Sequence, residues 1–129
     1  HPVSAAAALK NIEIIEEENL VKNAATVGKY FKESLLDLKS KQPLIGDVRG
    51  LGLLLSVELV SDSVTKKGFP KEFKIGDRLN GKFRENGLIL RVGSEILNLG
   101  PPLCITELEV DEIIEALDRS LTELQREWA

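Results

Sequence analysis

The sequence predicts one α+β domain with two layers, in which helices pack on one face of a small, mainly antiparallel sheet. Three observations favour this class. Periodic segments follow one another in the order helix, helix, strand, helix, strand, strand, helix. Tight turns join them, and two of the strands form a hairpin, which favours antiparallel pairing. Neither a repeat nor an internal boundary divides the chain, so we expect residues 1–129 to form a single small domain.

Composition and charge narrow the classes of partner. Hydrophobic residues make up 43% of the chain and charged residues 29%, which is typical of a globular domain. The net charge of -4 argues against nucleic acid or an anionic membrane as a partner, because both require a basic face. No apolar run approaches the roughly 20 residues of a membrane span, and the first residues lack a signal-peptide pattern. Cys104 is the only cysteine and has no disulfide partner, so we expect a cytoplasmic protein.

The first 18 residues predict a helix that starts almost at once. Pro2 suits a first helical turn, and Ala5–Ala8 is a run of strong helix formers. This alanine run is explained either by helix propensity alone or by close contact with another backbone. Because the chain begins at His1 and contains no methionine, we expect a fragment or a processed product.

A second helix is predicted from Leu20 to about Lys41, with Asn19 as its cap and Gln42-Pro43 as its end. Apolar residues recur along it in steps of three and four, which indicates a face buried in the core. These residues are Leu20, Ala24, Val27, Phe31, Leu35 and Leu38.

Alternation of apolar and polar residues predicts a strand from Leu51 to Val60. Gly50 and Gly52 indicate a bulge or a close backbone approach at its start. Arg49 precedes these glycines, and we expect it to form a salt bridge there rather than to bind an anion.

The C-terminal half predicts a third helix, a hairpin and a terminal helix. The third helix carries Ile75, Leu79 and Phe83 on one face and ends at Asn86-Gly87 with a left-handed cap. The hairpin strands are residues 88–92 and 96–99, with a turn at 93–95. Thr106 and Glu109 form the pattern of a capping box, which starts a helix that ends near Trp128.

Arg91 is the one residue that does not fit its surroundings, because it lies inside an apolar strand. A charge that faced the core would lose its hydration, so Arg91 should point to an edge, a partner or an anion. A structural ion pair explains it equally well.

The remaining residues supply no catalytic constellation. His1 is the only histidine, which removes His-based catalysis and a His-rich metal site. No glycine-rich phosphate loop precedes a helix. We interpret Cys104 as a small packing residue and predict no catalytic, cofactor-binding or metal-binding residue in the chain.

Several segments together resemble the C-terminal part of class III aminotransferases, which are pyridoxal-phosphate enzymes of fold type I. They appear in the family's order and cover almost the whole chain: HPVSAAAAL at His1, VRGLGLL at Val48, VELV at Val57, GLILR at Gly87 and GPPLCIT at Gly100. The segment VELVSDSVTKKGF is most similar to the branch that moves amino groups from ω-amino acids or amines to pyruvate.

The resemblance implies a role for Arg91. In that branch the arginine of the GLIxR strand binds the substrate carboxylate and swings aside for apolar substrates. A guanidinium can grip a carboxylate with two charge-assisted hydrogen bonds, which agrees with this role.

The resemblance also implies that most of the active site lies outside this chain. The family's Schiff-base lysine, its acidic partner of the pyridine nitrogen and its ring-stacking aromatic all belong to a large domain. We therefore expect pyridoxal 5'-phosphate in the full-length enzyme but none bound to this chain, which should be inactive alone. Residues 1–18 would link the small domain to the large one, and we expect a homodimer that takes an amino acid or amine donor and a 2-oxo acid acceptor.

Two other interpretations remain open. The chain is also compatible with another class III member, such as an acetylornithine, 4-aminobutyrate or diaminopelargonate transaminase or glutamate-1-semialdehyde aminomutase. A non-catalytic α+β interaction module belongs to a different class.

Overall fold

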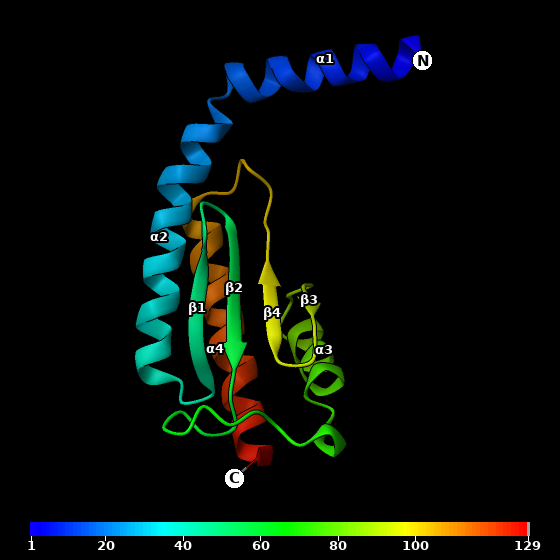
Figure 1. Ribbon diagram of the computed structural model, residues 1–129. Helices are drawn as coiled ribbons and strands as arrows, with labels where there is room; N and C mark the ends of the chain where they lie inside the picture. Colours follow the sequence, from blue (N-terminus) through cyan, green and yellow to red (C-terminus); the bar gives the residue numbers. More distant parts are fainter. Residues whose placement is uncertain (129) are drawn as a thin grey trace.

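A computed structural model describes residues 1–128 and confirms the predicted α+β fold (Figure 1). The four strands form one sheet in the order β1-β2-β4-β3, and each neighbouring pair is antiparallel. The elements are α1 (Pro2–Glu17), α2 (Leu20–Lys41), β1 (Ile45–Leu51), β2 (Leu54–Leu59), the 3-10 helix η1 (Lys71–Phe73), α3 (Ile75–Glu85), β3 (Arg91–Val92), β4 (Ile96–Leu99) and α4 (Glu107–Trp128).

The core lies between one face of the sheet and three helices. Alternate strand residues such as Val57 and Leu97 are fully buried, because they pack in one cluster with side chains of α2, α3 and α4. The predicted two-layer arrangement is therefore confirmed. The other side of the sheet, the open face, carries the side chains that point away from these helices.

Helix α1 projects away from this core (Figure 1). None of its residues is buried, although Val3, Leu9 and Ile12 are apolar and expose 71%, 64% and 52% of their surface. Exposed apolar side chains of this size suit a contact surface better than water. None of the helices between residues 1 and 128 is both long and apolar enough to span a membrane.

The predicted strand over 51–60 is wrong at its start, because the structure places a second strand before it. Residues 45–51 form β1, which turns at Gly52 and pairs with β2. Gly52 has a φ of 54°, a left-handed conformation that glycine adopts without strain. Its backbone also lies so close to Gly28 of α2 that a Cβ on Gly28 would overlap it. The predicted close approach is thus correct, but it marks a hairpin turn rather than the start of a strand.

The helix caps agree with the sequence except at α2. Gly87 ends α3 with a φ of 80°, and the capping box of α4 forms, with Thr106 N–H donating to Glu109 Oε2 at 2.8 Å. Asn19 does precede α2, but it adopts a left-handed conformation and its side chain forms no cap hydrogen bond. In the hairpin, only Arg91 and Val92 of the first predicted run are paired as a strand.

A charged clamp joins α3 to the end of α4. Glu127 accepts hydrogen bonds from Lys82 Nζ at 2.6 Å and from Arg78 Nη1 at 2.9 Å. These two bonds lower the pKa of the Glu127 carboxyl, and the hydrogen bond from Lys82 has the larger effect. The clamp closes the edge of the core where α3 and α4 meet.

We expect this clamp to make stability depend on pH in the acidic range. Because the folded pKa of Glu127 is lowered, its stabilisation is present above the unfolded pKa near 4.3 and is lost as pH falls through the folded pKa. The melting temperature of the chain should therefore fall more steeply between about pH 5 and 3 than that of Glu127→Gln. Glu16→Gln on α1 controls for the loss of one negative charge. Identical pH slopes for the wild type and Glu127→Gln would contradict the clamp.

Candidate functional site

Four polar side chains form one row across the open face of the sheet. The strand register pairs Arg49 with Ser56, Ser56 with Asn98, and Asn98 with Arg91. Side chains directly opposite each other on neighbouring strands share a face, so this row crosses β1, β2, β4 and β3 in turn. The row is the polar surface that the fold assembles from residues far apart in sequence.

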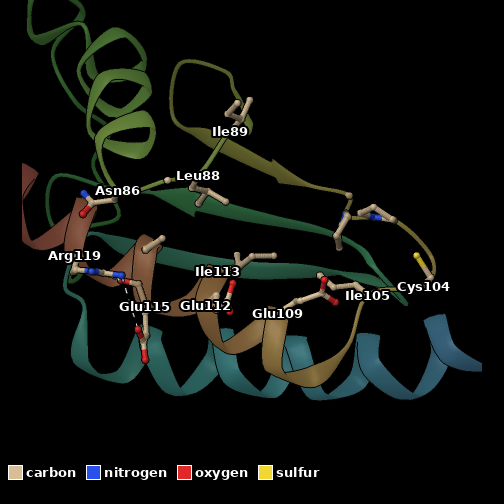
Figure 2. Close-up of a pocket in the computed structure, with 15 residues that line it drawn as sticks. Asn86, Leu88, Ile89, Cys104, Ile105, Glu109, Glu112, Ile113, Glu115 and Arg119 are labelled. Carbon is tan, nitrogen blue, oxygen red and sulfur yellow. Dashed lines mark hydrogen bonds and ion pairs between the residues drawn. The ribbon is translucent and has the colours of Figure 1, made fainter.

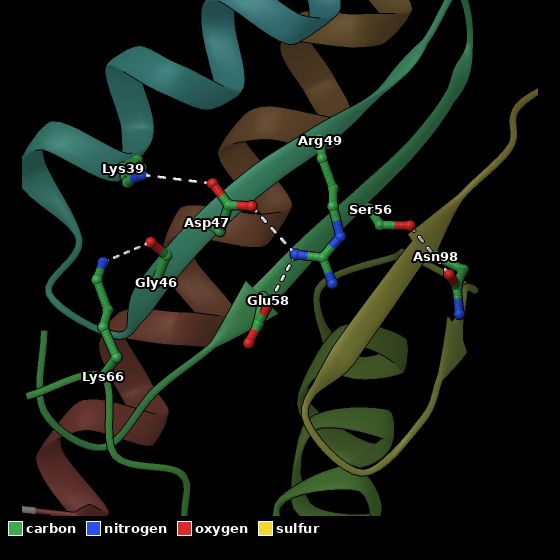
Figure 3. A network of polar contacts seen from close by, with 8 residues as sticks. All are labelled: Lys39, Gly46, Asp47, Arg49, Ser56, Glu58, Lys66 and Asn98. Atoms are coloured by element: carbon green, nitrogen blue, oxygen red, sulfur yellow. Dashed lines mark hydrogen bonds and ion pairs between the residues drawn. The ribbon is translucent and has the colours of Figure 1, made fainter.

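At one end of the row, Arg49 is held by two carboxylates (Figure 3). Its Nη1 donates to Glu58 at 2.5 Å and to Asp47 at 3.1 Å, and Asp47 also lies 3.8 Å from Lys39. The hydrogen bond from Arg49 is the main cause that lowers the pKa of the Asp47 carboxyl. The predicted salt bridge of Arg49 is confirmed, and its charge is already balanced by protein groups.

At the other end, Arg91 is exposed on an edge strand and lacks such partners. No carboxylate within residues 1–128 lies within 4 Å of its guanidinium. An ion pair inside the described chain therefore does not account for this arginine. Its charge remains available to a group from outside.

The local fold fixes the place of Arg91 firmly. The Schellman-type end of α3, in which Leu88 N–H donates to Phe83 O at 2.7 Å, directs the chain back toward the sheet. The hairpin turn then closes with Gly93 N–H donating to Ile96 O at 2.8 Å. Backbone on both sides of Arg91 is thus anchored, while no ion pair within residues 1–128 holds its side chain.

Arg91 lines a pocket of about 370 Å³ at the edge of the sheet. Asn98 is the other polar residue of this pocket, and none of its lining residues is acidic. The rest of the wall is mainly apolar: Phe31, Leu54, Leu88, Ile89, Leu90, Leu99, Gly100, Pro101 and Ile113. A cation and an amide at the rim of an apolar pocket suit a ligand with a carboxylate and an apolar body.

A larger pocket of about 760 Å³ lies between α4 and the two segments that flank the hairpin (Figure 2). Its polar wall is formed by exposed α4 side chains, among them Glu109, Glu112 and the Glu115–Arg119 pair at 3.9 Å. Cys104 lies at its rim as an exposed free thiol, so the predicted packing role of this cysteine is wrong. The Pro101-Pro102 segment carries it along the surface instead of into the core.

The part of the chain that the structure describes holds no complete catalytic group. Among residues 1–128, no three His, Cys, Asp or Glu side chains could bind one metal ion. No lysine lines the pocket at Arg91 that could bond to an aldehyde, and no acid there could pair with a ring nitrogen. Chemically, an unpaired guanidinium beside an uncharged amide on this face favours an anion over a cation.

Comparison with known proteins gives a consistent result. The family model described as aminotransferase class-III matches residues 1–121. An uncharacterised aminotransferase of Sinorhizobium fredii is 39% identical over 98% of this chain, and the taurine–pyruvate aminotransferase of Bilophila wadsworthia is 37% identical over 95%. The solved structure of an (S)-enantioselective ω-transaminase from Thermomicrobium roseum is 41% identical over 95% of this chain, with a TM-score of 0.91.

These relatives are much longer than the chain. It spans 28% of the length of the two curated relatives and 27% of the solved structure.

Proposed function

The chain belongs to the class III aminotransferases, and from this premise we propose that it forms the C-terminal small domain of a transaminase. The full-length enzyme would move an amino group from an ω-amino acid or amine to a 2-oxo acid such as pyruvate. The observation that carries this proposal is Arg91, an exposed and unpaired cation at the rim of a mainly apolar pocket. A carboxylate substrate would be gripped there by the guanidinium.

Pyridoxal 5'-phosphate does not fit the residues around Arg91, because neither a lysine nor an acid lines that pocket. We propose that residues outside this chain bind the cofactor in the full-length enzyme. The small domain would close one side of the cleft and supply Arg91. Its mainly apolar pocket wall would keep water from the substrate.

We further propose that α1 links this domain to a large domain. The exposed apolar side chains of Val3, Leu9 and Ile12 support this role, because a second surface would remove them from water. We also infer that the full-length protein is a homodimer. We infer a cytoplasmic location, with which the exposed free thiol of Cys104 is compatible.

The experiment that tests the proposal compares the 129-residue chain with the protein extended upstream through the large domain. Each is mixed with pyridoxal phosphate, its absorbance spectrum is recorded, and borohydride is added to trap any Schiff base. We expect only the extended protein to retain cofactor that borohydride traps on one lysine, and to change its absorbance spectrum when an amine donor is added. Specific trapping by the short chain would refute the assignment of cofactor binding to other residues. Failure of both proteins would favour a non-catalytic interaction module.

A further inference from the structure

We infer that Asn98 is a second carboxylate ligand beside Arg91, and that Ser56 orients its amide for this task. The inference rests on the proposed function, since it concerns the same substrate. It assigns a role in binding and specificity to two residues of the polar row on the open face.

Asn98 is the direct partner of Arg91 across the β3–β4 ladder. Both side chains are exposed, whereas Leu97, next to Asn98, is fully buried in the core. The two side chains therefore emerge next to each other on the open face. Both residues also belong to the wall of the pocket of about 370 Å³, whose helix-side wall includes Phe31 and Ile113. Paired residues of this kind have Cβ atoms about 5 Å apart, so one bound carboxylate can reach both side chains.

Ser56 determines which end of the Asn98 amide is available. Its Oγ donates a hydrogen bond to Asn98 Oδ1 at 3.1 Å (Figure 3). The amide oxygen, which would repel a carboxylate, is thereby engaged on the side of β2. The amide nitrogen forms no hydrogen bond with any group of residues 1–128 and keeps both N–H donors for a ligand.

The charges along the row favour a carboxylate at this end. Arg49 is balanced by Asp47 and Glu58, whereas no acid lines the pocket of Arg91 and Asn98. A carboxylate offers about four acceptor positions, so a bidentate arginine leaves room for a further donor. The amide of Asn98 supplies that donor without adding charge.

The test uses the full-length enzyme and measures kcat/KM separately for pyruvate and for 1-phenylethylamine, an amine without a carboxylate. For Asn98→Ala we expect kcat/KM for pyruvate to fall about 10- to 100-fold through KM, as for the loss of one hydrogen bond to a charged group. Asn98→Asp keeps the shape but opposes the carboxylate with a negative charge, so its loss should exceed that of Asn98→Ala. The value for 1-phenylethylamine should stay within about twofold in both variants.

Two further variants sharpen the test. Ser56→Ala frees the amide of Asn98 to turn. It should therefore lower kcat/KM for pyruvate, but by less than Asn98→Ala does. Ser63→Asp adds a negative charge on the exposed loop between β2 and η1, away from the polar row, and should leave kcat/KM for both substrates unchanged.

The outcomes separate this inference from the proposed function. If Arg91→Ala lowers kcat/KM for pyruvate but both Asn98 variants keep the wild-type value, Asn98 is not a ligand and the proposed function stands. Equal losses for pyruvate and 1-phenylethylamine in the Asn98 variants would overturn the inference as well, because they indicate a structural effect. If Arg91→Ala itself leaves pyruvate unchanged, the proposed role of the arginine fails.

Discussion

Replacing Arg91 with alanine in the full-length enzyme is expected to lower kcat/KM for pyruvate by about 100- to 10,000-fold. Two hydrogen bonds between a guanidinium and a carboxylate contribute roughly 1.5–3 kcal/mol each, and each 1.4 kcal/mol corresponds to a factor of ten. Arg91→Lys should lose less, because it keeps the charge but not the planar pair of donors. Steady-state kinetics with varied pyruvate measures the effect.

Arg49→Ala provides the matched control for this prediction. It removes an arginine from the same face and the same row, but one whose charge Asp47 and Glu58 already balance. We expect it to leave kcat/KM for pyruvate within about twofold, since screened surface charges contribute little at a distance. Equal losses in the two variants would mean that the effect reflects the general field of the face and not a bound carboxylate.

Reactions with amines that lack a carboxylate should respond differently to the loss of Arg91. The side chain has no partner within residues 1–128 that holds it in place, so it can move aside for an apolar group. We therefore expect Arg91→Ala to leave kcat/KM for 1-phenylethylamine unchanged or slightly higher. This difference between two substrates separates carboxylate binding from a loss of folded enzyme.

Local sequence signals predicted the helices and their ends well. The apolar stripe that contains Phe31 and Leu35 placed α2, and the pair Thr106 and Glu109 placed the start of α4. Both signals act within one or two helical turns, so no distant contact is needed to interpret them. Asn19 was predicted as a cap from its residue type alone, but its backbone conformation prevents the cap hydrogen bond.

Strand β1 escaped prediction because its residues do not favour a strand by themselves. Gly46, Asp47 and Gly50 all have low strand propensity and interrupt the alternation of apolar residues. The strand forms because the turn at Gly52 brings it against β2, close to Gly28 of α2. The contact with Gly28 joins segments far apart in the sequence and leaves no periodic trace in it.

Only part of the candidate site could be predicted, because some of its residues come together through strand pairing and not through a local pattern. Arg91 was conspicuous as a charge in an apolar strand, but Asn98 and Ser56 are ordinary polar residues when read alone. Counting outward from the turn at 93–95 pairs Arg91 with Asn98, so the hairpin itself held a signal for the second residue. Ser56 lies beside Asn98 only because β2 pairs with β4, and no local sequence pattern predicts that pairing.

Phe31→Ala is expected to lower the free energy of unfolding of the chain by about 3–5 kcal/mol. The Phe31 side chain is fully buried between α2 and the sheet, and its loss leaves a cavity that the neighbouring side chains cannot fill. Urea denaturation followed by circular dichroism measures the change. A domain stabilised by roughly 5–15 kcal/mol would lose a large part of its stability.

Leu9→Ala on α1 is the control, because Leu9 exposes 64% of its surface and α1 contributes no buried residue. We expect it to change the free energy of unfolding by less than about 0.5 kcal/mol. A cost for Phe31→Ala below 1 kcal/mol would contradict the described core. A large cost for Leu9→Ala that depends on protein concentration would instead show that α1 is covered by a second copy of the chain, since only association makes stability depend on concentration.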